Sequence, residues 1–179
     1  FETEMFESGM AYLEREDHDG TGCIVLDINM PGISGMELQA RLVEQGHDLP
    51  VIFLTGHGDV ANSVVAMKRG ALDFLTKPVD EADLLLAVRQ ALEHHRHVRE
   101  VNEQRDAILA RIDSLTAREH EVMQQLITGA LNKVVAERLQ IAVKTVKVHR
   151  AKIMEKMRVR SVAELLHLCH LVDIEPGER

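Results

Sequence analysis

Residues 23–32 read Cys-Ile-Val-Leu-Asp-Ile-Asn-Met-Pro-Gly, a short apolar run that ends in an acidic residue and a turn. The run is too short for a helix and is rich in β-branched or bulky side chains, which predicts a strand buried on both faces. Similar runs occupy residues 51–54 and 71–75, and helical patterns occupy residues 35–45 and 59–69 between them. Strands that alternate with helices predict a parallel sheet built from βαβ units.

A polar residue follows each of the three runs. Asp27 and Thr55 come directly after the first two runs, and Lys77 comes within two residues of the third. Each alone is typical of a turn or a helix cap. Because the carboxyl ends of parallel strands meet at one edge of a sheet, we expect the three side chains to form one site. An acid, a hydroxyl and an ammonium group together suit phosphate chemistry.

The sequences around these residues, at 26–35, 55–59 and 70–78, resemble the receiver domain of bacterial two-component response regulators. The resemblance implies a flavodoxin-like α/β fold. It also implies that Asp27 is the phosphoacceptor, with its carboxylate attacking the phosphohistidine of a sensor histidine kinase.

The same resemblance assigns roles to neighbouring residues. Lys77 would pair with the phosphoryl oxygens, and Thr55 would hydrogen-bond the phosphoryl group. The Phe74 ring would then turn inward, which makes a two-state switch biased by the new charge. An Mg²⁺ cofactor would take oxygen ligands from the Asp27 carboxylate and the backbone carbonyl of Asn29.

One feature of the family is missing. Receivers carry two acidic residues at the end of their first strand that hold Mg²⁺, and no such pair precedes Asp27 in a matching context. Residues 1–6 resemble the second strand of a receiver and residues 8–15 its second helix. We therefore expect an N-terminally incomplete receiver that lacks the first strand and helix, with Mg²⁺ binding reduced.

Two alternatives stay open. The missing acidic pair is compatible with a phosphorylation-independent regulator or a protein-binding adaptor. A phosphatase with an aspartate nucleophile would also use Asp27, but such enzymes need a second aspartate two residues later, where this chain has Asn29. The chain is therefore not expected to be an enzyme.

The net charge of −8 is unevenly distributed along the chain. Residues 1–79 carry −8, residues 80–113 carry −3 and residues 114–179 carry +3. Residues 133–160 hold 9 basic and 2 acidic residues, a pattern typical of a nucleic-acid surface, although a solvated charged face would look similar.

No stretch is apolar over the length of a membrane span, no signal peptide begins the chain, and Cys23 and Cys169 lack metal-ligand spacing. These features predict a cytoplasmic protein without a membrane partner.

The spacing of apolar residues decides between the two interpretations of the basic segment. Thr116 and Glu119 form a capping-box pair before a helix that ends at Gly129. Asn132 can cap a short second helix through residue 139, and a tight turn leads to a third helix at residues 143–157. Two short helices and a turn predict a helix-turn-helix.

The third helix has two faces. Val146, Ile153 and Met157 should pack inward, and the opposite face carries small and basic residues that suit the DNA major groove. The segment resembles the LuxR-type DNA-binding domain of FixJ/NarL-class response regulators, although Ala142 stands where that family has a capping serine. The candidate DNA-binding residues are Asn132, Lys133, Lys144, Thr145, Lys147, Val148, Arg150, Ala151 and Lys152. By the resemblance, Lys147, Val148 and Ala151 face bases, whereas Asn132, Lys133, Thr145 and Arg150 contact the backbone.

The segment between the domains contains no proline or glycine and predicts one long helix. Its apolar positions, interrupted by Arg105, fit either the seam of a short coiled coil or a helix packed on its own domains. His94, His95 and His97 lack a further ligand, so a metal site is not expected there. We expect a receiver domain at 1–79, the last receiver helix extended into a linker at 80–113, and an all-α, four-helix LuxR-type helix-turn-helix domain at 114–179.

The sequence therefore predicts a transcriptional response regulator switched by phosphorylation of Asp27. Its expected partners are a sensor histidine kinase, double-stranded promoter DNA, a second copy of the chain on activation, and RNA polymerase.

Overall fold

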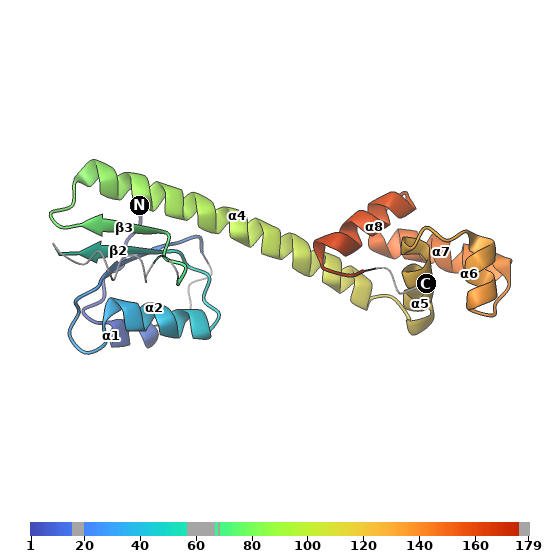
Figure 1. Cartoon of the computed structure of the whole chain (residues 1–179), viewed down its shortest axis with the longest axis horizontal. Helices are drawn as coiled ribbons and strands as arrows, with labels where there is room; N and C mark the ends of the chain where they lie inside the picture. Colours follow the sequence, from blue (N-terminus) through green and yellow to red (C-terminus); the bar gives the residue numbers. More distant parts are fainter. Residues whose placement is uncertain (16–19, 57–66, 68, 176–179) are drawn as a thin grey trace. The chain divides into compact units, whose positions relative to one another are not determined.

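The computed structural model describes residues 1–15, 20–56, 67 and 69–175, and it divides the chain into a unit of residues 1–99 and a unit of residues 100–179. The helix α4 belongs in part to each unit (Figure 1). The elements of the first unit are α1 (Gly9–Leu13), β1 (Ile24–Asp27), α2 (Gly35–Glu44), β2 (Val51–Thr55), β3 (Asp73–Thr76) and the first part of α4 (Glu81–Asp113). Those of the second unit are the end of α4, α5 (Ala117–Ile127), α6 (Asn132–Arg138), α7 (Val143–Met157) and α8 (Val162–Leu171).

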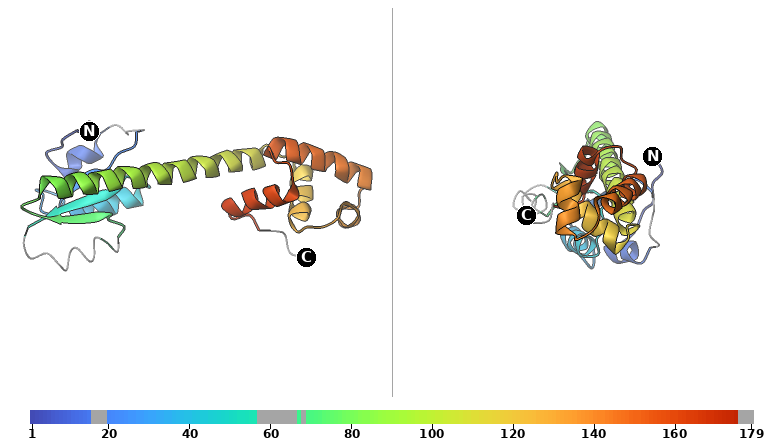
Figure 2. Two further views of the ribbon diagram at one scale, coloured as in Figure 1. Left: turned by 90° about the horizontal axis from the view of Figure 1, so that it is seen from above. Right: turned by 90° about the vertical axis from the view of Figure 1, so that its right-hand side faces the viewer.

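The described strands of the first unit form a parallel sheet in the order β1-β2-β3. Helices α1 and α2 cover one face, and the first part of α4 runs along the other (Figures 1 and 2). Phe53 of β2 packs toward the first face with Leu38 of α2. Its neighbour Ile52 packs toward the second face with Ala87 and Ala91 of α4. The central strand is therefore buried on both faces, as its apolar run predicts.

Most of the predicted elements of this unit are confirmed, with shifted ends. β3 begins at Asp73 rather than at residue 71, because its ladder to β2 starts where Asp73 stands opposite Ile52. The prediction of a strand at residues 1–6 is wrong. A strand needs a hydrogen-bonded neighbour, and within the described ranges no strand pairs with these residues. The predicted helix at 59–69 falls almost entirely on residues outside the described ones.

His95 of α4 has a structural role in the first unit. Its imidazole is buried, and its Nδ1 accepts a hydrogen bond from the backbone N–H of Gly22 at 3.0 Å. Its Nε2 lies 3.3 Å from a carboxylate oxygen of Asp48. The side chain thus joins α4 to the segment before β1 and to the segment before β2.

The second unit is a bundle of helices around one apolar core. Val122 and Leu126 of α5, Val146 and Ile153 of α7 and Leu165 of α8 are among its fully buried side chains. The predicted capping box of α5 is present, with Thr116 and Glu119 bonded reciprocally. The four predicted helices are confirmed, and α7 spans the predicted residues.

One predicted cap in this unit is wrong. Leu131, not Asn132, precedes the first turn of α6, and no side chain caps that helix. Asn132 instead accepts a hydrogen bond from Arg150 of α7 at 3.3 Å, so a tertiary contact takes the oxygen that would have capped the helix. Ala142 occupies the cap position of α7 without a side-chain hydrogen bond, as expected.

The end of α4 packs on the second unit. Ile108 and Ile112 are buried in its core, and Leu115 packs against the same cluster. Arg105 forms an ion pair with Asp173 at 2.9 Å. These contacts favour the interpretation of a helix packed on its own domain over a coiled-coil seam for this half of α4. Within the described ranges, every helix is too short or too polar to cross a bilayer.

Candidate functional site

The structure brings Asp27, Thr55 and Lys77 to one edge of the sheet. Asp27 is the last residue of β1, Thr55 is the last residue of β2, and Lys77 directly follows β3. The backbone N–H of Lys77 donates to the carbonyl of Thr55 at 2.6 Å. The Lys77 ammonium forms an ion pair with the Asp27 carboxylate. Parallel pairing of three strands therefore assembles an acid, a hydroxyl and an ammonium from positions far apart in the sequence.

The segment after β1 is tightly fitted around Asp27. The N–H of Gly35 donates to the carbonyl of Ile28 at 2.9 Å, which closes the turn from the strand into α2. A Cβ atom at Gly35 would lie 2.4 Å from the backbone oxygen of Asp27. Because a real Cβ cannot approach an oxygen so closely, this position requires glycine. Ser34 then caps α2 by accepting from the N–H of Glu37 at 3.2 Å.

The surroundings of Asp27 favour its ionised form. Partial burial alone would raise the pKa of this carboxyl. Hydrogen bonds from the Lys77 ammonium and from the Asn29 N–H, the latter at 3.0 Å, outweigh burial and lower the pKa below its ordinary value. The side chain of Asp27 remains 34% exposed, so an incoming group can reach it. The site holds an accessible anionic oxygen beside a fixed positive charge.

Two further site residues, Thr55 and Phe74, differ in how far their side chains are buried. Thr55 is buried, and its hydroxyl donates to the carbonyl of Gly56 at 3.2 Å. Phe74 on β3 is half-buried, and its ring centroid lies 6.4 Å from that of Phe53. The hydroxyl is thus engaged with its own loop, and the ring packs on the sheet.

The residues around Asp27 include oxygen groups that could hold a magnesium ion. Mg²⁺ prefers oxygen ligands and is held by one or two carboxylates together with phosphate oxygens and water. The Asp27 carboxylate and the Asn29 carbonyl are ligands of this kind. No group of three or more His, Cys, Asp or Glu side chains among the described residues is placed to hold a metal ion. The Asp27 carboxylate and the Asn29 carbonyl are therefore the ligands that this site could offer the ion, with the remaining positions left to phosphoryl oxygens and water.

In the second unit, α7 presents two faces as predicted. Val146, Ile153 and Met157 are buried in the core. The exposed residues of the helix include Lys144, Thr145, Lys147, Val148, Ala151 and Lys152. The exposed face therefore combines cations with small apolar side chains, a surface that suits a DNA groove.

Asn132, Lys133 and Arg150 differ in their availability to a ligand. Lys133 is exposed on α6, whereas Asn132 and Arg150 are half-buried and bonded to each other. Both line a hollow of about 460 Å³ that is otherwise mostly apolar. One guanidinium nitrogen of Arg150 is therefore turned toward Asn132, which leaves its other N–H donors for a further ligand.

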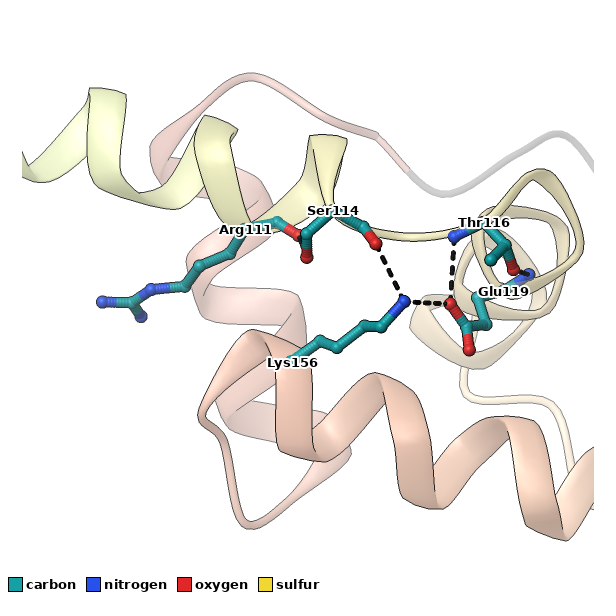
Figure 3. A network of polar contacts seen from close by, with 5 residues as sticks. All are labelled: Arg111, Ser114, Thr116, Glu119 and Lys156. Atoms are coloured by element: carbon teal, nitrogen blue, oxygen red, sulfur yellow. Dashed lines mark hydrogen bonds and ion pairs between the residues drawn. The ribbon is translucent and has the colours of Figure 1, made fainter.

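A polar network at the start of α5 involves a residue that the sequence did not single out (Figure 3). Lys156 of α7 bonds the buried carboxylate of Glu119 at 2.7 Å and the carbonyl of Ser114 at 2.8 Å. Hydrogen bonds from Lys156 and from the Thr116 N–H lower the pKa of Glu119 to about 2. The capping-box pattern identified Glu119, but no local pattern pairs it with a lysine 37 positions away.

Comparisons with known proteins cover both units. Residues 1–89 match the model of the response regulator receiver domain, and residues 113–169 match that of the bacterial regulatory proteins of the luxR family. The chain is 43% identical over 163 residues to the response regulator protein TmoT of Ectopseudomonas mendocina, a match that covers 91% of this chain and 74% of that protein. It is 41% identical over 171 residues to the transcriptional regulatory protein FixJ of Azorhizobium caulinodans, covering 96% of this chain and 81% of that protein.

A solved structure extends the match to three dimensions. The response regulator StyR aligns with a TM-score of 0.86 and 45% identity, covering 95% of this chain and 86% of that one. The predicted α/β receiver followed by a helical domain is thus confirmed. The chain belongs to the two-component response regulators of the FixJ/NarL class, DNA-binding transcriptional regulators that join a receiver domain to a LuxR-type helix-turn-helix domain.

Proposed function

We propose that phosphorylation of Asp27 switches this regulator. A carboxylate oxygen of Asp27 attacks the phosphorus of a kinase phosphohistidine, a P–O bond forms as the P–N bond breaks, and the imidazole leaves. The observation that carries this proposal is the Lys77–Asp27 ion pair at the carboxyl edge of the sheet, with the pKa of Asp27 lowered. It supports an ionised nucleophile in the resting protein. Lys77 then moves from the carboxylate to the phosphoryl oxygens.

The new charge is sensed by Thr55 and Phe74. The Thr55 hydroxyl exchanges its bond to the Gly56 carbonyl for one to a phosphoryl oxygen, which draws its loop inward. The half-buried Phe74 ring follows into the space that the loop leaves. The surface beside β3 changes as a result, and two phosphorylated receivers pair there.

Magnesium would be held by the Asp27 carboxylate and the Asn29 carbonyl, where it would neutralise the phosphoryl oxygens. No enzymatic turnover is proposed, because Asn29 stands where an aspartate-based phosphatase needs its second acid.

The output of the switch is promoter binding in the cytoplasm. Lys147, Val148 and Ala151 face base edges in the major groove, and the Lys133 ammonium contacts phosphate. The remaining exposed cations of α7, Lys144 and Lys152, add phosphate contacts, and Thr145 contacts the backbone near the start of the helix. A dimer places two recognition helices on adjacent half-sites, where RNA polymerase is a further partner.

Phosphorylation is tested with acetyl phosphate and Mg²⁺ and intact-mass measurement. We expect one added phosphoryl group on the wild-type protein in a version that includes the first strand of the receiver. The Asp83→Asn variant of the same version, a control that removes an exposed acid in the first turn of α4, should gain the same group. Asp27→Asn should gain none. Labelling of Asp27→Asn, or no labelling of the wild type at any Mg²⁺ concentration, contradicts the assignment and leaves the phosphorylation-independent function.

DNA recognition is tested with duplexes selected by the wild-type protein from a randomised pool. Lys147→Ala should lower the preference for the selected sequence over random DNA. Lys133→Ala should weaken binding to both DNAs equally and reduce the slope of log affinity against log salt by about 1. If neither substitution alters binding, α7 is not the recognition helix.

A further inference from the structure

Lys156 joins three helices of the second unit through one ammonium group. It lies in the last turn of α7 and bonds the carbonyl of Ser114, just after α4, at 2.8 Å. It also bonds the carboxylate of Glu119, in the first turn of α5, at 2.7 Å. Figure 3 shows the ammonium between these two oxygens. The end of the linker helix and the start of α5 are therefore both fixed to the end of the recognition helix.

A second set of contacts joins the same ends. Arg111, in the last turn of α4, donates to the carbonyl of Met157 at 3.4 Å, and the Ser114 hydroxyl donates to the carbonyl of Arg111 at 2.6 Å. Below these bonds, Ile108 and Ile112 are buried in the same core as Met157. The last turns of α4 thus cannot shift without disturbing the C-terminal end of α7.

The position of Lys156 separates it from the base-facing surface. Along an α-helix that rises 1.5 Å per residue, its Cα lies roughly 13 Å beyond that of Lys147. Its ammonium already has two oxygen partners, and its side chain is 33% exposed. Lys156 lies within the basic segment 133–160, but its contacts with Glu119 and Ser114 point to an internal role.

The ion pair between Lys156 and Glu119 favours one arrangement of α4, α5 and α7. The Glu119 side chain is 4% exposed and carries a negative charge, so a buried carboxylate would lose its main partner if the ammonium moved away. The carbonyl of Ser114 lies beyond the hydrogen-bonded turns of α4, and Lys156 is the donor that it has in the structure. Lys156 can reach both oxygens at once only while α4, α5 and α7 keep their present relation.

We propose that Lys156 is a positioning residue for DNA recognition, which couples the end of the linker helix to the angle at which α7 enters the groove. The proposal rests on the proposed role of α7 in reading DNA. A change at the end of α4 reaches the recognition helix through the Ser114 carbonyl and the Lys156 ammonium. Lys156 therefore governs discrimination between DNA sequences without contacting DNA.

The test compares Lys156→Met, which keeps the unbranched stem and removes the charge, with Lys156→Arg and Lys152→Met in the full chain. For Lys156→Met we expect affinity for the selected duplex to fall about tenfold, with affinity for random DNA and the salt slope unchanged. Lys156→Arg, which can still pair with Glu119, should restore most of the discrimination. Lys152→Met removes an exposed cation of the same helix. It should instead weaken binding to both the selected and the random DNA and reduce the slope of log affinity against log salt.

Hydrogen exchange in α5–α8 shows that each variant is folded at the assay temperature. If Lys156→Met impairs folding, Glu119→Gln carries the same comparison, because it weakens the pair but keeps an acceptor for the Thr116 N–H. If the folded variant still discriminates between the selected and the random DNA as the wild type does, Lys156 is purely structural and the proposal is overturned. If Lys156→Met reduces the slope of log affinity against log salt, Lys156 contacts phosphate, and the proposal is also overturned. If Lys147→Ala leaves discrimination between the two DNAs unchanged, the proposed role of α7 in reading bases is contradicted, and the proposal for Lys156 is contradicted with it.

Discussion

Replacing Ile112 by alanine should destabilise the DNA-binding unit although the residue lies in the linker helix. Ile112 is 7% exposed and packs in the core formed by α5, α7 and α8. A domain boundary drawn at residue 114 from the sequence would leave this side chain, with Ile108, outside the unit. The structure places both inside it.

The expected loss follows from cavity formation. Removing the three outer carbons of a buried isoleucine costs about 2 to 4 kcal/mol, as the sum of lost transfer energy and an unfilled cavity. At 1.36 kcal/mol per factor of ten, this corresponds to a roughly 30- to 900-fold loss of protection against hydrogen exchange. The loss should appear in the most protected amides of the unit, which exchange by its cooperative opening.

Hydrogen exchange with mass spectrometry on the full chain measures this directly, because peptides from α5–α8 and from β1–β3 are followed in one experiment. The β1–β3 peptides serve as the internal reference and should keep their protection. Val101→Ala, at a 49% exposed position of the same helix, is the matched control and should change stability by less than about 0.5 kcal/mol.

Two results would refute the reasoning. If Ile112→Ala leaves the α5–α8 peptides as protected as in the wild type, the end of α4 is not part of their core. If Val101→Ala lowers their protection as much as Ile112→Ala does, the effect comes from the helix itself and not from packing.

Three further predictions concern single contacts. Because the pKa of Glu119 in the folded protein is lowered from 4.5 to about 2, the stability that its charge contributes is complete above pH 4.5 and is lost as pH falls toward 2. The difference in unfolding free energy between the wild type and Glu119→Gln should therefore shrink over this range by at most about 3 kcal/mol. The partial exposure of the Lys156 side chain makes the expected change smaller than this limit. Gly35→Ala should lower exchange protection in β1 and α2 and slow phosphorylation, since its Cβ would collide with the backbone oxygen of Asp27; equal protection in variant and wild type would contradict this close fit. Ala142→Ser should raise the melting temperature of the α5–α8 unit by supplying about 1 kcal/mol of capping, and an unchanged melting temperature would mean that the helix start is already satisfied.

Local patterns in the sequence were sufficient for most of the elements. The apolar runs before Asp27 and Thr55 both became strands, as their short length and their β-branched or bulky side chains predict. Only the second is buried on both faces; the prediction of burial on both faces is wrong for β1, where Val25 is 41% exposed. The capping box at Thr116 formed because both of its residues lie within one helical turn. The two faces of α7 followed from helical periodicity alone.

Predictions failed where a distant partner decided the outcome. Residues 1–6 have a strand-like composition, but pairing in a sheet depends on a neighbouring strand. Asn132 is a good capping residue, but Arg150 of another helix takes its side-chain oxygen. The start of β3 depended in the same way on its register with β2.

The sequence by itself determined that Asp27, Thr55 and Lys77 lie at or just after the ends of three parallel strands and that a basic helix follows, because these features depend on residue type and short spacing. Only the tertiary structure decided which of the basic residues face solvent and which are used internally. Lys147 and Lys156 lie on the same helix and look alike in sequence, yet the first is exposed and the second is bonded to Glu119 and Ser114. Charge can be counted along a chain, but the partner of a charge is set by contacts between helices that the chain brings together only when it folds.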